Sequence, residues 1–254
     1  MSDVNIHLPL PWPVGETVSL PPDKAHHALH VQRLAAGEAV RLFDGAGLAA
    51  PGVFEPVGKR QAAIRVTGPA TPVPDVRHPL DLILALPRHE TMDTVIRQAC
   101  ELGVARLLPV LSERSCVPAR VARQKADHWH RVMVAACEQS GRAAFLELLP
   151  ARPLPEVLAA VGPEGARRLF FWEEAPAAHA PWGIAPGQPV VAAVGPEGGW
   201  SAAEAEAFAS AGFDTRSLGA LILRVDPAVA AVTAVVVHQI RARHGVREIL
   251  NDPP

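Results

Sequence analysis

The sequence predicts a two-domain α/β protein, in which a small β-barrel with one helix precedes a larger domain built on a mostly parallel sheet. Three observations support this prediction. Short apolar strands around a glycine-rich turn fill most of the first 68 residues. A proline-rich stretch follows at about residues 69–79. From Leu80 onward, apolar strands alternate with helical patterns, which is typical of a parallel sheet whose strands are connected by helices.

The strands of the first domain are short. Residues 39–43 and 48–54 are rich in apolar side chains and flank the turn Asp44-Gly45-Ala46-Gly47, so together they predict a β-hairpin. Residues 62–66 form a further short alternating strand. These strands are expected to make up the barrel.

One helix and a linker complete the first half of the chain. Asp23 is expected to be the N-cap of a helix that ends at Gly37, because two prolines precede Asp23 and apolar residues follow at helical spacing. Three prolines at positions 69, 72 and 74 predict a semi-rigid spacer. The linker is therefore placed at about residues 69–79, which assigns residues 1–70 to the first domain and 79–254 to the second.

The second domain is predicted from a repeated strand–helix pattern. Its helix at residues 90–102 has Met92, Val95, Ile96 and Ala99 on one face. Strands are expected at residues 80–86, 107–111, 168–172, 189–194 and 213–218, and further helices at 118–142, 154–161 and 228–243. One more helix is expected to begin with the capping box Ser201-Ala-Ala-Glu204.

Charge limits the classes of function. The chain has 24 Lys plus Arg and 26 Asp plus Glu, for a formal net charge of −2, and its pI is about 6.6. A protein that binds nucleic acid through bulk charge usually has a basic pI, so any such role requires a local basic patch. The only net-positive third is residues 76–150, with 10 basic and 8 acidic residues.

Cysteine usage and the N-terminus point to a cytoplasmic protein. Cys100, Cys116 and Cys137 have no C-x-x-C spacing, so they are interpreted as reduced thiols. No secretory signal pattern is visible, and the longest apolar run, residues 227–237, is too short to span a bilayer. No membrane association is expected.

Two loops are the candidates for a ligand site. The strand at 190–194 runs into Gly195-Pro196-Glu197-Gly198-Gly199 and then into a helix, an arrangement that lets backbone N–H groups approach a ligand. The loop from Leu218 to Arg224 also follows a strand and precedes a helix, so both loops are expected at the same sheet edge. Together they suggest an apolar pocket with backbone donors, suited to an adenosine-like ligand. A tight turn with no ligand is the alternative reading of the first loop.

Other motifs lack the context that their chemistry needs. Residues 45–50 match the dinucleotide fingerprint G-x-G-x-x-A as a string, but no helix follows them. Residues 162–165 repeat part of the first loop and are interpreted as a coincidence. His26 and His30 have a spacing that can bind a metal, but no third ligand is evident, so no metal is expected.

In this order and spacing, a set of segments resembles the RsmE family of ribosomal RNA methyltransferases, of the SPOUT class. The segments extend over nearly the whole chain. They are His26-His27 through Arg33, Leu42-Phe43-Asp44-Gly45, Arg88 with Met92, Glu101-Leu102-Gly103-Val104, Pro109, Ser112-Glu113-Arg114-Ser115, Trp129, Ala136-Cys137-Glu138-Gln139-Ser140-Gly141-Arg142, Gly195-Pro196-Glu197-Gly198-Gly199, Leu218-Gly219 and Ile222-Leu223-Arg224.

The resemblance implies a fold and an activity. It implies a PUA-like barrel that holds RNA, a SPOUT α/β domain with a C-terminal trefoil knot, and a homodimer. The activity is transfer of a methyl group from S-adenosylmethionine to N3 of a specific uridine in 16S ribosomal RNA, within the assembled small ribosomal subunit. The residues implied to bind the cofactor are Val194, Gly195, Pro196, Glu197, Gly198, Gly199, Leu218, Gly219, Ile222, Leu223 and Arg224.

The chain departs from the family pattern beside the second loop. The family usually has Thr-Glu-Thr-Ala after the Leu-Arg pair, whereas this chain has Val225-Asp226-Pro227-Ala228. Two hydroxyls are lost and the carboxylate is one methylene shorter. Proline is well tolerated in a first helical turn, so the fold is expected to survive, whereas the catalytic geometry is open.

Roles for individual residues follow as hypotheses. Arg224 is expected to stabilise negative charge on a uracil carbonyl oxygen, or alternatively to pair with Asp226 or Glu197 and hold the loop. Asp226, Glu197 or water is expected to accept the imide proton. Arg33, Arg114 and Arg142 are the candidates for phosphate contacts.

Two rival functions remain at this point. A non-catalytic RNA-binding member of the fold would have lost activity through the Val225-Asp226-Pro227 change, and it would bind RNA without cofactor. An oxidoreductase that uses the Gly45 loop would bind a nicotinamide cofactor.

Overall fold

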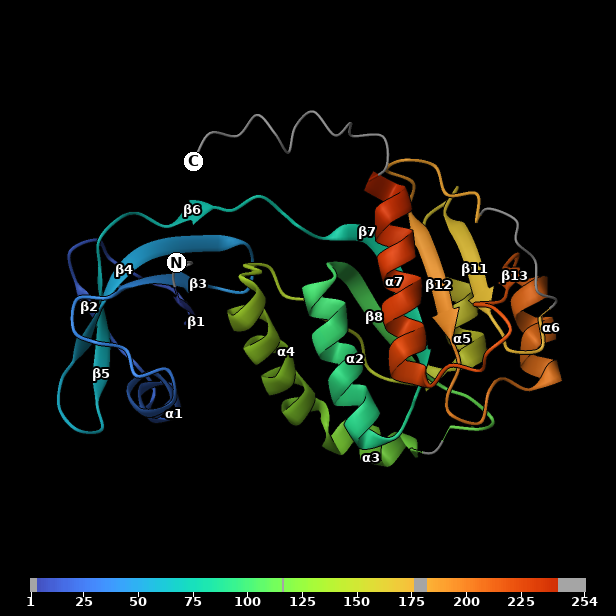
Figure 1. Ribbon diagram of the computed structural model, residues 1–254, viewed down its shortest axis with the longest axis horizontal. Coiled ribbons are helices and arrows are strands. Elements are labelled where there is room, and N and C mark those ends of the chain that lie inside the picture. The colour runs from blue at the N-terminus through green and yellow to red at the C-terminus, as the bar shows by residue number, and fades with distance from the viewer. Residues whose placement is uncertain (1–3, 116, 176–181, 242–254) are drawn as a thin grey trace. The chain divides into compact units, whose positions relative to one another are not determined.

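The computed structural model describes residues 4–115, 117–175 and 182–241, and the chain divides into two compact units (Figure 1). The first unit runs to Val76 and also includes Val134–Phe145. The second comprises Arg77–Met133 and the residues from Leu146 onward. This differs from the linear division of the sequence, which placed residues 134–145 in the second domain.

The first unit contains a six-stranded sheet. Its strands are β1 (Val4–His7), β2 (Thr17–Ser19), β3 (Ala39–Phe43), β4 (Leu48–Pro56), β5 (Ala62–Val66) and β6 (Thr71–Pro72). Their order is β1-β3-β4-β5-β2, and β6 pairs with β4. The β1–β3 pair is parallel and the others are antiparallel. The three predicted strands are therefore confirmed.

The hairpin turn between β3 and β4 is organised by one carboxylate. Asp44 Oδ1 accepts hydrogen bonds from the backbone N–H groups of Ala46, Gly47 and Leu48, at 2.8, 3.0 and 2.9 Å. Gly45 and Gly47 have φ of +81° and +108°, values that glycine adopts without steric cost. A strand follows this turn directly, so the fingerprint-like residues 45–50 form a hairpin.

The predicted first helix begins earlier and ends sooner than expected. Helix α1 spans Pro22–His26, and the π-helix η1 continues it over His27–Val31. Pro21 is the N-cap and Pro22 fills the first helical position, where its missing N–H costs nothing, so the prediction of Asp23 as N-cap is wrong. Asp23 instead lies in the first turn. Beyond the helix, Arg33 has a left-handed backbone with φ of +56°.

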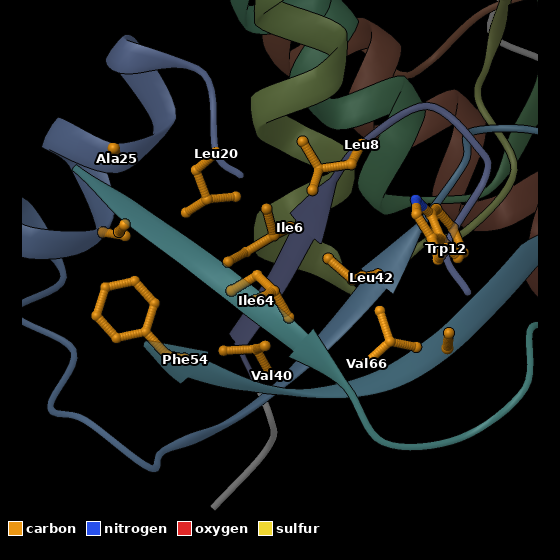
Figure 2. Close-up of a cluster of buried hydrophobic side chains, with 13 residues drawn as sticks. Ile6, Leu8, Trp12, Leu20, Ala25, Val40, Leu42, Phe54, Ile64 and Val66 are labelled. Atoms are coloured by element: carbon orange, nitrogen blue, oxygen red, sulfur yellow. The ribbon is translucent and has the colours of Figure 1, made fainter. Parts of the chain in front are cut away.

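Apolar side chains from the strands and the helix form the core of this unit. Ile6, Leu42, Phe54 and Ile64 are at most 4% exposed, and Figure 2 shows them converging with their neighbours. Burial of this kind contributes about 1.5–3 kcal/mol per large aliphatic or aromatic side chain.

The segment 134–145 joins the first unit through hydrogen bonds to β1, β3 and α1. Glu138 Oε1 accepts from the backbone N–H of His7 at 2.9 Å and pairs with Lys24 Nζ at 2.6 Å. Arg41 Nη1 donates to the Gly141 carbonyl at 3.1 Å. Glu138 and Gly141 thus supply partners to residues 100 to 131 positions earlier in the chain.

The second unit contains a seven-stranded sheet in which every pairing is parallel, as predicted. Its strands are β7 (His78–Ala85), β8 (Val104–Leu111), β9 (Glu147–Leu148), β10 (Arg152–Pro153), β11 (Arg167–Phe171), β12 (Val190–Val194) and β13 (Asp214–Arg216). The order is β10-β8-β7-β12-β11-β13, and β9 pairs with β8. All five residues of β12 are buried, as expected for a strand with both faces covered.

Among the described residues, the helices that follow β7 along the chain are α2 (His89–Glu101), α3 (Ala119–Gln124), α4 (Ala126–Ser140), α5 (Leu154–Ala160), α6 (Ala202–Ser210) and α7 (Val225–Arg241). The helix predicted over 118–142 is interrupted at Lys125, and the last helix begins at Val225 rather than Ala228. The predicted apolar face of α2 is confirmed, because Met92, Val95, Ile96 and Ala99 are fully buried.

The helices cover both faces of the sheet. Leu154 and Val157 of α5 and Phe208 of α6 pack with alternate strand residues such as Ile83 and Val191. Helices α2 and α7 contact each other and lie against the other face (Figure 1). In the described part of the chain, no helix has the length and apolar character needed to cross a membrane.

One ion pair links the two strands β7 and β8. Arg106 donates from Nε to Asp81 Oδ1 at 2.8 Å, and its Nη2 also contacts the same carboxylate. Asp81 is 7% exposed. The hydrogen bond to Asp81 raises the pKa of the Arg106 guanidinium above its ordinary value.

Candidate functional site

A cavity of about 240 Å³ lies at the carboxyl ends of three neighbouring parallel strands, β12, β11 and β13. Ligands of open α/β sheets bind at this edge. The lining comes from the segment after each strand and the start of α7: Phe171, Trp172 and Glu173; Val194, Gly195, Pro196, Glu197 and Gly199; Ser217 through Val225; and Ala228. The two loops predicted from the sequence therefore meet at one site.

The first loop needs glycine at two positions for different reasons. A Cβ on Gly195 would lie 2.9 Å from Nε1 of the buried Trp200. A Cβ on Gly199 would overlap Oε1 of Glu173, and Gly199 also has φ of +68°. Side chains are excluded at both positions, and the backbone itself forms this wall of the cavity.

The loop leads into α6 through the predicted capping box, which is confirmed. Ser201 Oγ accepts from the Glu204 N–H at 3.2 Å, and Glu204 Oε2 accepts from the Ser201 N–H at 2.9 Å. Glu204 Oε1 also accepts from the backbone N–H of Glu113 at 3.0 Å. One buried carboxylate thus ties the start of α6 to the segment that follows β8.

A second contact joins the same two segments. Arg114 Nη1 donates to the Gly198 carbonyl at 3.0 Å, and a Cβ on Gly198 would lie 3.2 Å from Cβ of Arg114. Gly198 therefore packs against Arg114, and it is the one predicted cofactor residue that does not line the cavity. Arg114 remains exposed.

Glu197 lines the cavity, but its carboxylate is engaged elsewhere. Oε1 accepts from the backbone N–H of Arg88 at 3.1 Å and from Thr91 Oγ1 at 3.3 Å, at the N-terminus of α2. The N-terminal end of a helix dipole favours a negative charge. This arrangement suits a residue that holds the loop in place better than one that accepts a substrate proton.

The second loop is apolar and unusually exposed. Leu221 and Ile222 are 81% and 86% exposed, and Leu223 is 39% exposed. Ser217 Oγ hydrogen-bonds both the N–H and the carbonyl of Gly219, at 3.1 Å each, and so stabilises the start of the loop.

Arg224 ends this loop and presents its cation at the cavity. The side chain is exposed and makes no hydrogen bond or ion pair with any residue that the structure describes. The alternative in which Arg224 pairs with Asp226 or Glu197 is therefore absent from the structure. Asp226 lies half-buried in the first turn of α7 and outside the cavity lining.

The three arginines predicted to contact phosphate have different surroundings. Arg33 is exposed in the first unit. Arg114 is exposed but bonded to the loop carbonyl described above. Arg142 is 2% exposed and its Nε donates to the Ala144 carbonyl at 2.6 Å, so its assignment as a phosphate contact is wrong: the guanidinium is committed to the interior.

Sequence reasoning missed one wall of the cavity. Phe171, Trp172 and Glu173 follow β11, and no motif marks them. The end of a predicted strand at Trp172 was a usable signal, but only the strand order places that end between β12 and β13.

Among the described residues, no group of three or more His, Cys, Asp or Glu side chains is arranged to hold a metal ion.

Comparisons with known proteins agree with this architecture. A model of an RNA methyltransferase domain matches residues 75–237, and a model of an RNA methyltransferase PUA domain matches residues 20–67. The chain is 32% identical over 237 residues to the ribosomal RNA small subunit methyltransferase E of Synechocystis sp., covering 90% of this chain and 74% of that protein. The chain belongs to this family.

Other members of the methyltransferase E family give consistent matches. The protein of that name from Aquifex aeolicus is 30% identical over 158 residues, which is 59% of this chain and 63% of that protein. A crystal structure of the Neisseria gonorrhoeae methyltransferase E bound to S-adenosyl methionine has a TM-score of 0.78 and 31% identity, and covers 92% of this chain and 96% of that chain.

The departure from the family pattern leaves the local fold intact. Helix α7 begins at Val225, and Pro227 lies within its first turn, where a proline is tolerated. Val225 is buried and Arg224 still lines the cavity. The shortened carboxylate of Asp226 is thus placed by an unbroken helix.

Proposed function

We propose that this chain transfers a methyl group from S-adenosylmethionine to N3 of a specific uridine in 16S ribosomal RNA of the small ribosomal subunit. The observation that carries the proposal is the cavity at the ends of β12, β11 and β13, which both family loops line and at which Arg224 presents a cation that no described residue pairs with. Membership of the methyltransferase E family, and the relative bound to S-adenosyl methionine, support the choice of cofactor.

The cavity fits an adenosine-type cofactor. Its walls combine apolar side chains, such as Phe171, Val194 and Leu218, with the bare backbone of Gly195 and Gly199. Apolar walls with a few placed polar groups are usual for such ligands. When bound, S-adenosylmethionine supplies a methyl group on a positively charged sulfur, which is an electrophile.

Arg224 is proposed as the catalytic electrostatic group. A uridine that loses its N3 proton carries negative charge on the adjacent carbonyl oxygens. A guanidinium that has no partner among the described residues is available to stabilise that charge, as donors do in an oxyanion hole. Binding and orientation of the two reactants supply the remainder of the rate enhancement, because the chemistry needs no metal and no covalent enzyme intermediate.

Asp226 is proposed as the proton acceptor in preference to Glu197. Glu197 already accepts two hydrogen bonds at the start of α2. The Asp226 side chain makes no hydrogen bond or ion pair with the described residues, and it follows Arg224 by two positions. The test is the rate of methylation as a function of pH. If Asp226→Asn removes the fall in rate at acidic pH and Glu197→Gln keeps it, this choice is supported.

RNA binding is proposed for the first domain, residues 1–70, with catalysis in residues 79–254. The PUA-domain match covers residues 20–67, and exposed Arg33 is the remaining first-domain candidate for a phosphate contact. A uridine in folded RNA must leave its stack before it reaches a cavity of this kind. We infer that Arg114, beside the Gly195–Gly199 loop, contacts the RNA backbone near the flipped base.

Three further family properties are proposed together. The C-terminal part of the second domain is expected to be threaded as the trefoil knot of the SPOUT class, with the cavity at the knot. A homodimer is expected, and the exposed Leu221 and Ile222 are suited to burial by a second copy. The chain is expected to act in the cytoplasm, where ribosomal subunits are found.

The direct experiment uses labelled S-adenosylmethionine and small subunits from cells that lack this modification. Label in N3-methyluridine of 16S RNA, found by nucleoside mapping, is the expected result. Label in free RNA but not in subunits would contradict the assembled-particle substrate. RNA binding without cofactor binding would establish the non-catalytic alternative instead.

A further inference from the structure

Glu173 is a charged residue of the cavity that none of the sequence motifs includes. It lies two residues after the end of β11 at Phe171 and lines the cavity beside Trp172. Its side chain is exposed, and its carboxylate has no hydrogen bond or ion pair with any residue in the described ranges. An ionised carboxylate has room for about four hydrogen bonds, so this group has acceptor capacity that the described residues leave unused.

The carboxylate is placed against the glycine loop. A Cβ on Gly199 would overlap Glu173 Oε1, so the carboxylate lies directly on the backbone of Gly199. β11 and β12 are paired in parallel, with Phe171 beside Val194 at their carboxyl ends. Glu173 and the Gly195–Gly199 loop therefore extend from two adjacent strand ends into one cavity.

The other charged groups of the lining do not compete for this role. Glu197 is the second carboxylate, and it accepts two hydrogen bonds at the N-terminus of α2. Arg224 is the one cation of the lining, and it is not paired with Glu173. Of the two carboxylates in this lining, Glu173 is thus the one that remains available to the donors of a ligand.

A glycine-rich loop beside an acidic side chain also occurs in α/β sheets that bind dinucleotides. There, a glycine-rich loop follows one strand and lets the ligand approach the backbone, while an acidic side chain near the neighbouring strand accepts a hydrogen bond from a ribose hydroxyl. Two adjacent hydroxyls match the two oxygens of one carboxylate. Here β12 supplies the glycine loop and β11 the acidic side chain.

We propose that Glu173 accepts hydrogen bonds from the ribose hydroxyl groups of the adenosine part of the cofactor. This inference rests on the proposed function, because it assumes that the cavity takes S-adenosylmethionine. Glu173 is then a specificity-determining residue that distinguishes a ribonucleoside cofactor from its deoxy analogues. The same interaction requires glycine at position 199, because any side chain there would displace the Glu173 carboxylate.

The test is isothermal titration of the full-length protein with S-adenosylmethionine and with S-adenosylhomocysteine. Both ligands carry the ribose, whereas only the first carries the positive sulfur. Glu173→Gln is expected to weaken both by the same factor, roughly ten-fold, as loss of a charge-assisted hydrogen bond would. Glu174→Gln is the matched control, because Glu174 is the neighbouring exposed glutamate outside the lining, and it should bind as the wild type does.

A third ligand completes the cycle: S-adenosylhomocysteine without its two ribose hydroxyls. The wild type should bind this analogue more weakly than the parent, and Glu173→Gln should show little further discrimination between the two. A full additional loss in the variant would overturn the proposal, as would unchanged affinity for both parent ligands.

Two other results have distinct meanings. Weakening confined to S-adenosylmethionine would overturn the ribose assignment in favour of attraction to the sulfonium charge. If the wild type bound neither parent ligand, the proposed function would fail, and this inference with it. A thermal melt of each variant checks that the fold is retained.

Discussion

Replacement of Glu204 gives a quantitative test of how the segments around the cavity are held together. Glu204 is 6% exposed, and its carboxylate accepts from the backbone N–H groups of Ser201 and Glu113, at 2.9 and 3.0 Å. Glu204→Gln keeps the size of the side chain but turns an amide NH₂ toward one of these two donors. One hydrogen bond to a charged group is lost and the other is weakened, which predicts a loss of about 2–4 kcal/mol in the free energy of unfolding.

The assay is thermal unfolding, with affinity for S-adenosylhomocysteine measured in parallel. At about 2–4 °C per kcal/mol for a chain of this size, Glu204→Gln should lower the Tm by at least about 4 °C. The affinity should also fall several-fold, because Glu204 ties the helix after the glycine loop to the segment after β8. Glu206→Gln is the control, since Glu206 is an exposed glutamate on the same helix and its replacement should cost within about 0.5 kcal/mol. Equal melting temperatures for the two variants would refute the reasoning.

Three further variants test the walls of the cavity. Gly199→Ala should abolish cofactor binding in calorimetry while Gly187→Ala, at a glycine with open space around it, should not; equal affinities would contradict the close packing at Gly199. Arg114→Ala should weaken cofactor binding by a few-fold, because its hydrogen bond to the Gly198 carbonyl is lost. A mobility-shift assay should show weaker RNA binding as well. RNA affinity equal to that of the wild type would show that Arg114 is not part of the RNA-binding surface. Glu197→Gln should reduce the free energy of unfolding by about 1 kcal/mol, because it removes a negative charge from the start of α2. The same variant should leave the dependence of the methylation rate on pH unchanged. If it removed the fall in rate at acidic pH, Glu197 would be the proton acceptor.

Much of the fold follows from local patterns in the sequence. The strands at 39–43 and 62–66 have the predicted bounds, and the capping box at Ser201 forms both of its hydrogen bonds. These features depend on neighbours within a few residues, so a short window of sequence contains the information. The prediction of the N-cap of the first helix was wrong because two prolines precede Asp23 in the sequence. The fixed φ of Pro22 suits the first helical position, so the helix begins there and Pro21 is the N-cap.

Long-range features required the structure. Arg142 looked like a free cation in a basic segment, but the carbonyl of Ala144 and burial hold it inside. Glu173 could not be assigned to the site because the order of strands, rather than their existence, brings β11 between β12 and β13. The two loops were predictable because each follows a strand of the same parallel sheet.

The measurement that tests the central claim most directly is a comparison of wild type and Arg224→Ala in two assays on the same preparations. Methylation of 16S RNA in undermethylated small subunits should be abolished in the variant, whereas its affinity for S-adenosylhomocysteine should fall far less, by no more than about three-fold. Arg224 would then stabilise the reacting uridine rather than hold the cofactor. Normal turnover by Arg224→Ala would contradict the account.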